Sequence, residues 1–462
     1  MPDSHTDSVD YDLKALLEAQ RAYFRLGSTR SVDFRKERLL GLEQELVKRS
    51  DDILKALASD LGKPALEAYV SEVFFSIAEV RLVVKKLSRW AKPRRVGNPF
   101  YYWPARSEIR HEPYGSALIV APWNYPIQLS LSPLIAAVAA GNTVVLKPSE
   151  LAPASSTILA EIIKAVFNPQ HVAVVEGGVE LGKELLEQSF DYWFYTGSER
   201  VGRLYGEAAA KCLAPITLEL GGKCPVIVAH DAPIEATVER IITTKFFNAG
   251  QTCIAPDFVL VPSHRHEAFV NAAKVALEAA FAGNPRENLA RIVNQEHYER
   301  IRSLIPLEAI RVGEDNPDDR FLAPTLIPYS TWECPAMQEE IFGPVLPIIP
   351  YHDLDEEIGR LSRMPSPLAL YVFSRNNHFL ETIAGAVPSG SVCFNDVIKQ
   401  ATNLELPFGG VGASGMGRYR GKAGYEAFSY ERAVTKRWFC KDPFLVKPPY
   451  GDRLESLRKL MK

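Results

Sequence analysis

The 462-residue sequence has few cysteines, and none of the six lies in a CxxC pair or at a regular spacing. This arrangement excludes a disulfide-stapled domain and offers no zinc-ligand pattern. We therefore expect no metal site and a reducing, cytoplasmic compartment. An excess of charge of one sign is also missing, since 53 Lys and Arg are matched by 56 Asp and Glu. Such a balance predicts no nucleic-acid partner.

Long unbroken hydrophobic runs are absent as well. The most apolar stretch, residues 117–140, is interrupted by Pro122, Asn124 and Pro133, whose polar backbone a bilayer could not satisfy. The first twelve residues are polar and acidic, unlike the basic start of a signal peptide. We expect no membrane anchor.

Short β-rich runs alternate with helical runs along the middle of the chain. The expected strands are 117–121, 143–146, 172–175, 192–195 and 225–229, and the expected helices are 127–140, 155–167, 180–187 and 199–211. This alternation predicts an α/β fold with a doubly wound parallel sheet. A chain of this length exceeds one compact core, so a second α/β domain should follow from about Pro225.

The segments that follow the strands carry polar side chains. Asn124 follows the first expected strand, Lys147 and Glu150 follow the second, and Thr196-Gly197-Ser198 follows the fourth. Ligands bind beyond the carboxyl ends of parallel strands. A small-residue turn before a helix presents free N–H groups to a phosphate. Together these segments predict a dinucleotide site.

Cys253 is the candidate nucleophile. It follows Gly250-Gln251-Thr252, a turn whose small and polar residues would leave the sulfur accessible. The alternative is that Cys253 is a small buried hydrophobe, as most free cysteines are. Glu219 is the candidate base, because apolar neighbours and the following Gly221-Gly222 pair would partly desolvate it. A solvated or lysine-paired glutamate is the alternative.

Asn124 has a side-chain amide that can donate to an oxyanion, although asparagine in a proline-flanked turn is often only turn chemistry. Lys147 can contact a ribose or phosphate or simply remain solvated. Gly410 to Gly415 matches GxGxxG, but no strand, turn and helix surround it. Gly197 to Gly202 resembles half a Walker A loop, yet Arg203-Leu204 follows where Lys-Ser/Thr is needed. An ATPase is therefore disfavoured.

Seven segments together resemble the aldehyde dehydrogenase superfamily, most closely its class 3 branch of fatty and aromatic aldehyde dehydrogenases. They are Pro122-Trp123-Asn124-Tyr125-Pro126, Lys147-Pro148-Ser149-Glu150, Tyr195-Thr196-Gly197-Ser198, Glu219-Leu220-Gly221-Gly222-Lys223, Gly250-Gln251-Thr252-Cys253-Ile254-Ala255-Pro256-Asp257, Glu339-Glu340-Ile341-Phe342-Gly343-Pro344 and Leu406-Pro407-Phe408-Gly409-Gly410-Val411-Gly412. They occur in the family's order between residues 115 and 430. Cys224 departs from the Ser or Asn that is usual there.

The resemblance implies that Cys253 is the nucleophile, Glu219 the base for deacylation, and Asn124 with the Cys253 N–H the oxyanion hole. It implies contacts to NAD or NADP from Trp123, Lys147, Glu150, Thr196, Gly197, Ser198, Val201, Gly202, Leu220, Glu340 and Phe342. Lys147 and Glu150 would contact the adenosine ribose, and the turn at 197–202 the pyrophosphate. Glu340 and Phe342 would contact the nicotinamide ribose and ring.

The resemblance also completes the domain plan. We expect residues 1–92 and 115–218 to bind NAD(P) and residues 219–403 to form the catalytic domain. Residues 93–114 and 404–430 would be bridging segments of a homodimer, and 431–462 a C-terminal tail.

The expected reaction is NAD(P)-dependent oxidation of an aldehyde to the acid through a cysteine thiohemiacetal and thioester. The alternatives are a dehydrogenase that passes the acyl group to coenzyme A and a catalytically silent structural protein. Tyr69, Phe74 and Tyr125 suggest an apolar entrance for medium or long aliphatic or aromatic aldehydes.

Overall fold

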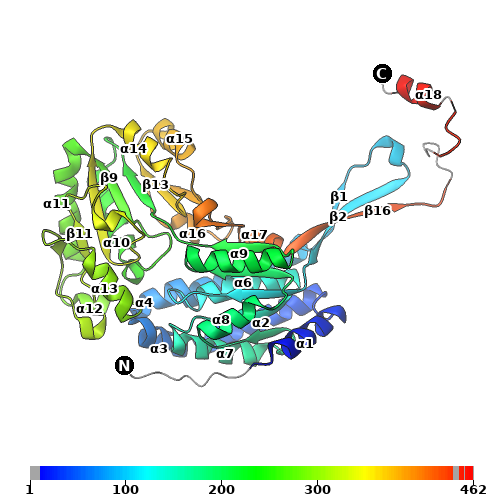
Figure 1. Ribbon diagram of the computed structural model, residues 1–462, viewed down its shortest axis with the longest axis horizontal. Helices are drawn as coiled ribbons and strands as arrows, with labels where there is room; N and C mark the ends of the chain where they lie inside the picture. The colour runs from blue at the N-terminus through cyan, green and yellow to red at the C-terminus, as the bar shows by residue number, and fades with distance from the viewer. Residues whose placement is uncertain (1–10, 441–446, 452, 461–462) are drawn as a thin grey trace.

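A computed structural model describes residues 11–440, 447–451 and 453–460 of the chain. Two mainly parallel sheets, each covered by helices, form the body of the molecule, and a three-stranded antiparallel sheet projects from it as an arm (Figure 1). The α/β class with a doubly wound sheet and a second α/β unit, as predicted from the sequence, is confirmed.

The first sheet has six strands in the order β15-β7-β6-β3-β4-β5, and all but β15 run parallel. Its strands are β3 (Ser116–Val120), β4 (Thr143–Lys147), β5 (Val172–Val174), β6 (Tyr192–Thr196), β7 (Ile216–Glu219) and β15 (Gly415–Met416). Every residue of β3, β4 and β6 is buried, as expected for central strands covered on both faces.

Helices cover both faces of this sheet, and alternate side chains of β3 pack on opposite sides. Ala117 and Ile119 face one hydrophobic cluster, and Leu118 and Val120 face the other. The first cluster includes α2 (Val32–Lys48), α3 (Ser50–Leu61), α5 (Phe75–Trp90), α6 (Gln128–Ala140) and α7 (Pro153–Val166). The second includes α1 (Leu13–Arg25), α8 (Val179–Leu186) and α9 (Glu199–Lys211).

The second sheet has seven strands in the order β10-β11-β12-β9-β8-β13-β14, with only β10 antiparallel. They are β8 (Pro225–Val228), β9 (Phe258–Pro262), β10 (Ile310–Arg311), β11 (Thr325–Ile327), β12 (Val345–Tyr351), β13 (Ala369–Phe373) and β14 (Ser391–Phe394). Its helices are α10 (Ile234–Lys245), α11 (Ser263–Ala280), α12 (Pro285–Asn288), α13 (Gln295–Ser303), α14 (Leu354–Leu361), α15 (Asn377–Ala386) and α16 (Lys399–Thr402).

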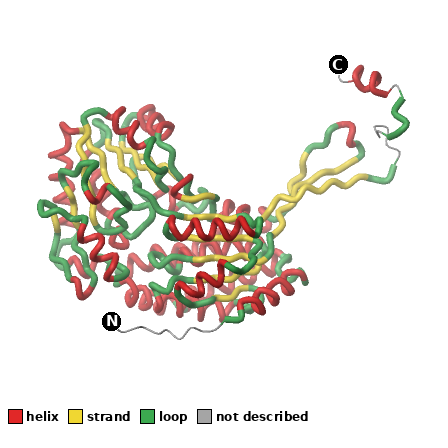
Figure 2. Tube along the Cα trace, in the orientation of Figure 1, coloured by secondary structure: helices red, strands yellow, loops and turns green. Residues whose placement is uncertain are grey.

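The arm consists of β1 (Arg94–Val96), β2 (Ala105–Pro113) and β16 (Ser429–Arg437) (Figures 1 and 2). The 3-10 turn η2 (Phe100–Tyr102) lies between β1 and β2. All nine residues of β16 pair with β2. Residues 431–437 are therefore part of the arm, where we expected a tail from residue 431, because β2 offers them a backbone ladder. The expected tail residues 441–446, 452, 461 and 462 lie outside the described residues.

Within the 404–430 segment that we expect to bridge subunits, residues 404–428 pack in this chain largely on the first sheet and its helices. Strand β15 pairs with β7, so that Gly415 lies opposite Glu219. A Cβ on Gly415 would lie 2.1 Å from the Leu218 carbonyl oxygen, so only glycine fits this approach. Helix α17 (Gly421–Ala427) contacts α5 and α6. A long-range pairing of two residues leaves no periodic trace in the sequence.

The helical stretch from residue 65 to residue 90 is interrupted by one π-helical segment. It comprises α4 (Ala65–Ala68), η1 (Tyr69–Phe74) and α5. Single π turns within α-helices are frequent at functional sites. None of the helices within residues 11–440, 447–451 and 453–460 has the length and apolar character needed to span a bilayer.

Candidate active site

Asn124 and Cys253 come from different sheets and meet through the backbone of Gln251. Asn124 lies in the loop between β3 and α6, and its side-chain nitrogen Nδ2 donates a 3.0 Å hydrogen bond to the Gln251 carbonyl. The Asn124 side chain is buried, with 4% of its surface exposed. Tyr125 and Thr252 add a 2.7 Å hydroxyl contact between the same two segments. The structure thus brings the predicted amide donor beside the turn that carries the predicted nucleophile.

Cys253 lies in the turn before β9 and is partly exposed. Burial of the sulfur, together with the negative charges of Glu340 and Glu219, raises the pKa of the Cys253 thiol to about 12. The thiol is therefore protonated at neutral pH in this state. Behind it, the Cys224 sulfur donates a hydrogen bond of 3.4 Å to the Cys253 carbonyl, and Cys224 itself is fully buried.

Glu219 is the last residue of β7 and has only 2% of its surface exposed. Neither carboxyl oxygen has a hydrogen-bond partner among the described residues. Burial raises its pKa well above the usual range, although Arg420 and Arg418 act in the opposite direction. Burial therefore favours the protonated form of this carboxyl, which becomes a base only after losing its proton.

The segments that follow β4 and β6 carry the groups that are expected to bind the phosphate and ribose of a dinucleotide. Lys147 ends β4, and its ammonium lies 2.9 Å from a carboxylate oxygen of Glu150. Thr196 ends β6, and its buried hydroxyl has no hydrogen-bond partner among the described residues. Ser198 is the N-cap of α9 but makes no side-chain cap hydrogen bond. The first N–H groups of α9 therefore remain free for an anion.

Close packing holds α9 against the end of β7. A Cβ on Gly202 would lie 2.7 Å from a methyl carbon of Leu220, while Val201 packs against the same hydrophobic cluster as Leu220. A Cβ on Gly197 would similarly lie 2.3 Å from the Tyr195 hydroxyl. Small residues at these points keep the helix start close to the strand ends. The buried Thr196 hydroxyl and the uncapped start of α9 fit a dinucleotide phosphate.

Glu340 and Phe342 lie in the loop before β12 and reach the same region. A Cβ on Gly221 would lie 2.1 Å from Glu340 Oε2, so the carboxyl packs directly on the backbone that follows Glu219. Burial raises the pKa of Glu340 to about 8. Phe342 has a φ of 50°, a left-handed conformation that is strained for a bulky residue. Its ring packs edge to face on Trp123, with 5.5 Å between the two ring centres.

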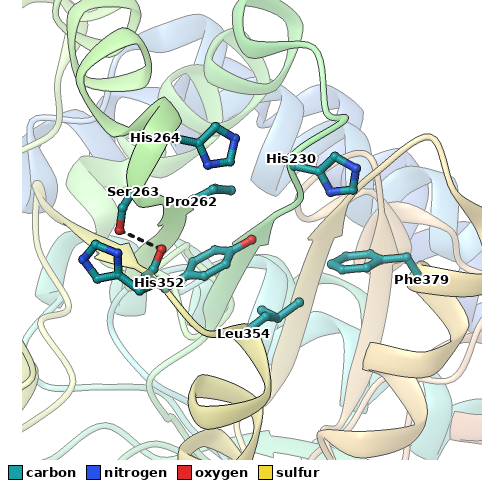
Figure 3. Close-up of a pocket in the computed structure, with 8 residues that line it drawn as sticks. His230, Pro262, Ser263, His264, His352, Leu354 and Phe379 are labelled. Carbon is teal, nitrogen blue, oxygen red and sulfur yellow. Dashed lines mark hydrogen bonds between the residues drawn. The ribbon is translucent and has the colours of Figure 1, made fainter.

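A cavity of about 320 Å³ lies at the carboxyl edge of the second sheet (Figure 3). Its lining includes His230, His264 and His352, which follow β8, β9 and β12. The Ser263 hydroxyl donates a 2.8 Å hydrogen bond to the Tyr351 carbonyl, drawn as the dashed line from Ser263 in Figure 3. None of the predicted site residues lines this cavity. In the part of the chain that the structure describes, no group of three or more His, Cys, Asp or Glu side chains is placed to hold a metal ion.

Three residues that contact the site carry no signal of this in the sequence. The Asn248 side chain, fully buried, donates 2.8 Å to the Asn124 carbonyl. Lys63 donates to the same carbonyl at 3.1 Å. Arg420 is buried, and its positive charge acts to lower the pKa of Glu219. The helix-ending Gly62-Lys63-Pro64 pattern predicts a turn, but it does not show that tertiary packing buries the lysine.

Comparisons with known proteins agree with this geometry. Residues 3–434 match the aldehyde dehydrogenase family. The chain is 40% identical over 447 residues to 4,4'-diaponeurosporen-aldehyde dehydrogenase of Staphylococcus aureus, covering 96% of this chain and 97% of that one. It is 42% identical over 455 residues to human aldehyde dehydrogenase family 3 member B1, covering 98% of this chain and 94% of that one.

Solved structures give the same result. A substrate-bound Staphylococcus aureus AldH superposes with a TM-score of 0.95 at 39% identity, covering 98% of this chain and all of that one. A Mycobacterium tuberculosis aldehyde dehydrogenase complexed with NAD+ superposes with a TM-score of 0.81 at 27% identity, covering 91% and 89%.

Two mainly parallel sheets contribute adjoining segments to one site, and the matches to known proteins assign the chain to the oxidoreductases. The chain belongs to the aldehyde dehydrogenase family, and its activity is the NAD(P)-dependent oxidation of an aldehyde to the acid.

Proposed function

We propose that the chain oxidises medium-chain, long-chain or aromatic aldehydes by covalent catalysis at Cys253. The observation that carries the proposal is the Asn124 amide, fixed 3.0 Å from the Gln251 carbonyl two residues before the sulfur. An amide so placed can stabilise the oxyanion that forms when the sulfur attacks a carbonyl carbon. The chain's own residues then supply nucleophile, oxyanion donor and base.

The proposed steps begin with the Cys253 thiol. It loses its proton, its sulfur forms a bond to the aldehyde carbon, and the carbonyl electron pair becomes an oxyanion held by Asn124 and the Cys253 N–H. A bound nicotinamide would supply the acceptor for the hydride that leaves this carbon. The result on Cys253 is a thioester. Glu219 then removes a proton from water, and the resulting hydroxide adds to the thioester carbon. The C–S bond breaks, the acid is released, and the leaving sulfur regains a proton from Glu219 as the thiol.

A different set of residues, at the ends of β4 and β6 and in the loop before β12, would hold the cofactor. Lys147 and Glu150 would bind the adenosine ribose, the start of α9 with Gly197 to Gly202 the pyrophosphate, and Glu340 the nicotinamide ribose. Two observations support this assignment: the buried Thr196 hydroxyl has no hydrogen-bond partner in the described part of the chain, and Ser198 makes no side-chain cap at the start of α9. Trp123, Leu220 and Phe342 would border the nicotinamide ring. Reduction of NAD+ or NADP+ in the presence of hexanal, decanal, hexadecanal or benzaldehyde tests the proposed function. Absence of reduction with every pair of aldehyde and cofactor would refute it.

Exposed apolar side chains on the π-helical segment support an apolar substrate. Tyr69 and Phe74 are 40% and 55% exposed, whereas Tyr125 is buried beside Thr252. The name of the Staphylococcus aureus relative, a 4,4'-diaponeurosporen-aldehyde dehydrogenase, is consistent with a long aldehyde. Release to water rather than coenzyme A follows from the role proposed for Glu219. Added coenzyme A should therefore leave the rate and the acid product unchanged.

The arm supports a homodimer, because Tyr101, Tyr102 and Trp103 are 45–68% exposed around its tip. Such aromatic side chains are enriched in protein interfaces. All six cysteines are free, in keeping with a reducing cytoplasm.

Glu150→Gln should shift cofactor preference toward NADP+. The Glu150 carboxylate lies 2.9 Å from the Lys147 ammonium and would repel a 2′-phosphate. Its removal frees Lys147 to attract that phosphate, and the NADP+/NAD+ ratio of kcat/KM should rise about fivefold, which corresponds to ~1 kcal/mol for a partly exposed pair. Glu180→Gln, which removes an exposed carboxylate paired with Lys183, is the matched control. An unchanged NADP+/NAD+ ratio of kcat/KM would show that Glu150 does not contact the adenosine ribose.

Inactivation of the cofactor-free enzyme by iodoacetamide should accelerate steadily with pH. The raised pKa of Cys253, about 12, leaves the thiolate a small fraction throughout the neutral range. That fraction grows about tenfold per pH unit between about pH 7 and 9. Loss of activity measures the rate, and peptide mass mapping identifies the alkylated cysteine. A rate that levels off below about pH 8 would mean a thiol with a far lower pKa.

A further inference from the structure

A buried ion pair lies directly beneath the Asn124 loop. Lys63, between α3 and α4, and Glu72, in the π-helical segment η1, have fully buried side chains, and their Nζ and Oε1 atoms are 2.7 Å apart. Removing two charges from water costs free energy that their attraction offsets only when the remaining donors and acceptors are also satisfied. The position of those further hydrogen bonds therefore indicates what the pair holds in place.

The further hydrogen bonds of the pair go to the backbone at both ends of the segment from Asn124 to Gln128. Lys63 donates to the Asn124 carbonyl at 3.1 Å, and its ammonium lies 4.2 Å from the centre of the Tyr125 ring. The second oxygen of Glu72 accepts from the N–H groups of Ile127 and Gln128, at 3.0 and 2.9 Å. The pair thus fixes the peptide of Asn124 and the start of α6, which together set the direction of the Asn124 side chain.

The same segment also reaches the turn that leads to Cys253. Glu67, one helical turn before Glu72, accepts a 2.7 Å hydrogen bond from the Asn248 N–H. Asn248 and Ala249 have φ values of 54° and 53°, a strained left-handed pair. Asn248 in turn donates to the carbonyls of Asn124 and Gln251. One short stretch of chain therefore anchors both the oxyanion donor and the nucleophile turn.

We propose that Lys63 and Glu72 are positioning residues that hold the Asn124 amide at the distance and angle needed to stabilise the oxyanion on Cys253. The proposal rests on the proposed function. Neither side chain touches the sulfur or the amide nitrogen, and both act through the Asn124 backbone. With its carbonyl held by Lys63 and Asn248, the Asn124 peptide cannot rotate, and the free N–H of its side chain keeps one direction.

The test is a double-mutant cycle between Lys63→Met and Asn124→Ala, read as steady-state kcat and as KM for NAD+. Lys63→Met should lower kcat roughly 10- to 100-fold, and Asn124→Ala roughly 100- to 1000-fold, the usual cost of removing an oxyanion donor. In the Asn124→Ala background Lys63→Met should cost little more, because the group that it positions is gone. KM for NAD+ should be unchanged in every variant.

Controls separate positioning from a loss of folding. Lys63→Arg keeps a donor for both Glu72 and the Asn124 carbonyl and should recover most of the kcat. Lys183→Met removes an exposed lysine paired with Glu180 and should leave kcat unchanged. If Lys63→Met does not fold, Glu72→Gln replaces it in the same cycle, with thermal unfolding and NAD+ binding measured for each variant.

Additive effects in the cycle, or a wild-type kcat for a folded Lys63→Met, would overturn the proposal while the proposed function stands. Failure of the proposed function is a different result, namely full turnover in Cys253→Ala or none in the wild type.

Discussion

Cys253→Ala should reduce aldehyde-dependent formation of reduced cofactor to background, a loss of roughly 10⁴-fold or more. The reason is chemical: an aldehyde carbon becomes a hydride donor only after a nucleophile has added to it. Cys253 lies two residues after Gln251, whose carbonyl accepts a hydrogen bond from the Asn124 amide. Loss of one sulfur atom from a partly exposed residue leaves the surrounding packing intact. The measurement is the absorbance of reduced NAD+ and NADP+ with hexanal, decanal, hexadecanal and benzaldehyde.

The matched control is Cys224→Ala, which removes the neighbouring buried thiol without touching the nucleophile. Its 3.4 Å hydrogen bond to the Cys253 carbonyl is weak, so most of the turnover should remain. Thermal unfolding and NAD+ binding of Cys253→Ala should match the wild type. Wild-type turnover in a folded Cys253→Ala would end the covalent scheme.

Glu219→Gln should separate the two halves of the reaction. Hydride transfer does not need the carboxylate, so one reduced nicotinamide per active site should form in a rapid first phase. Steady-state turnover should then fall by roughly 10²- to 10⁴-fold, the usual contribution of a general base. Since Glu219 is buried and its carboxyl has no hydrogen-bond partner among the described residues, a neutral amide of the same shape should replace it at little cost in stability. Stopped-flow absorbance resolves the two phases.

The pH dependence of the deacylation rate is a second test of the role of Glu219. The raised pKa of Glu219 means that its basic form increases as pH rises. Deacylation in the wild type should therefore accelerate with pH, whereas the slow phase of Glu219→Gln should lose that dependence. Equal reduction of the first and second phases in Glu219→Gln would assign the residue to hydride transfer instead.

The sequence predicts the first sheet well because its central strands are continuous buried runs that alternate with helices. The expected strand at 143–146 differs from β4 by one residue, and the expected helix at 199–211 coincides with α9. Strand β7 was not expected, because Ile216–Glu219 is short and lies between Pro215 and a Gly-Gly pair. Strand β15 has two residues and exists only through its pairing with β7.

In the candidate site, too, local motifs could be predicted from the sequence, whereas long-range contacts could not. Motif order places Cys253, Glu219 and Asn124 in the sequence, and the structure places Asn124 beside the Cys253 turn and buries Glu219 at the end of β7. The groups beneath Asn124 were not predicted, since nothing local distinguishes a buried Lys63 or Glu72 from a solvated one. Their burial depends on contacts with the α6 start, which lies more than fifty residues later.

Intact-protein mass spectrometry of Glu219→Gln, mixed with decanal and NAD+, tests the covalent scheme most directly. The account predicts an added mass equal to the decanoyl group, carried by the peptide that contains Cys253 and absent from the Glu219→Gln/Cys253→Ala double variant. Formation of reduced nicotinamide without that adduct, or an adduct on another cysteine, would contradict it.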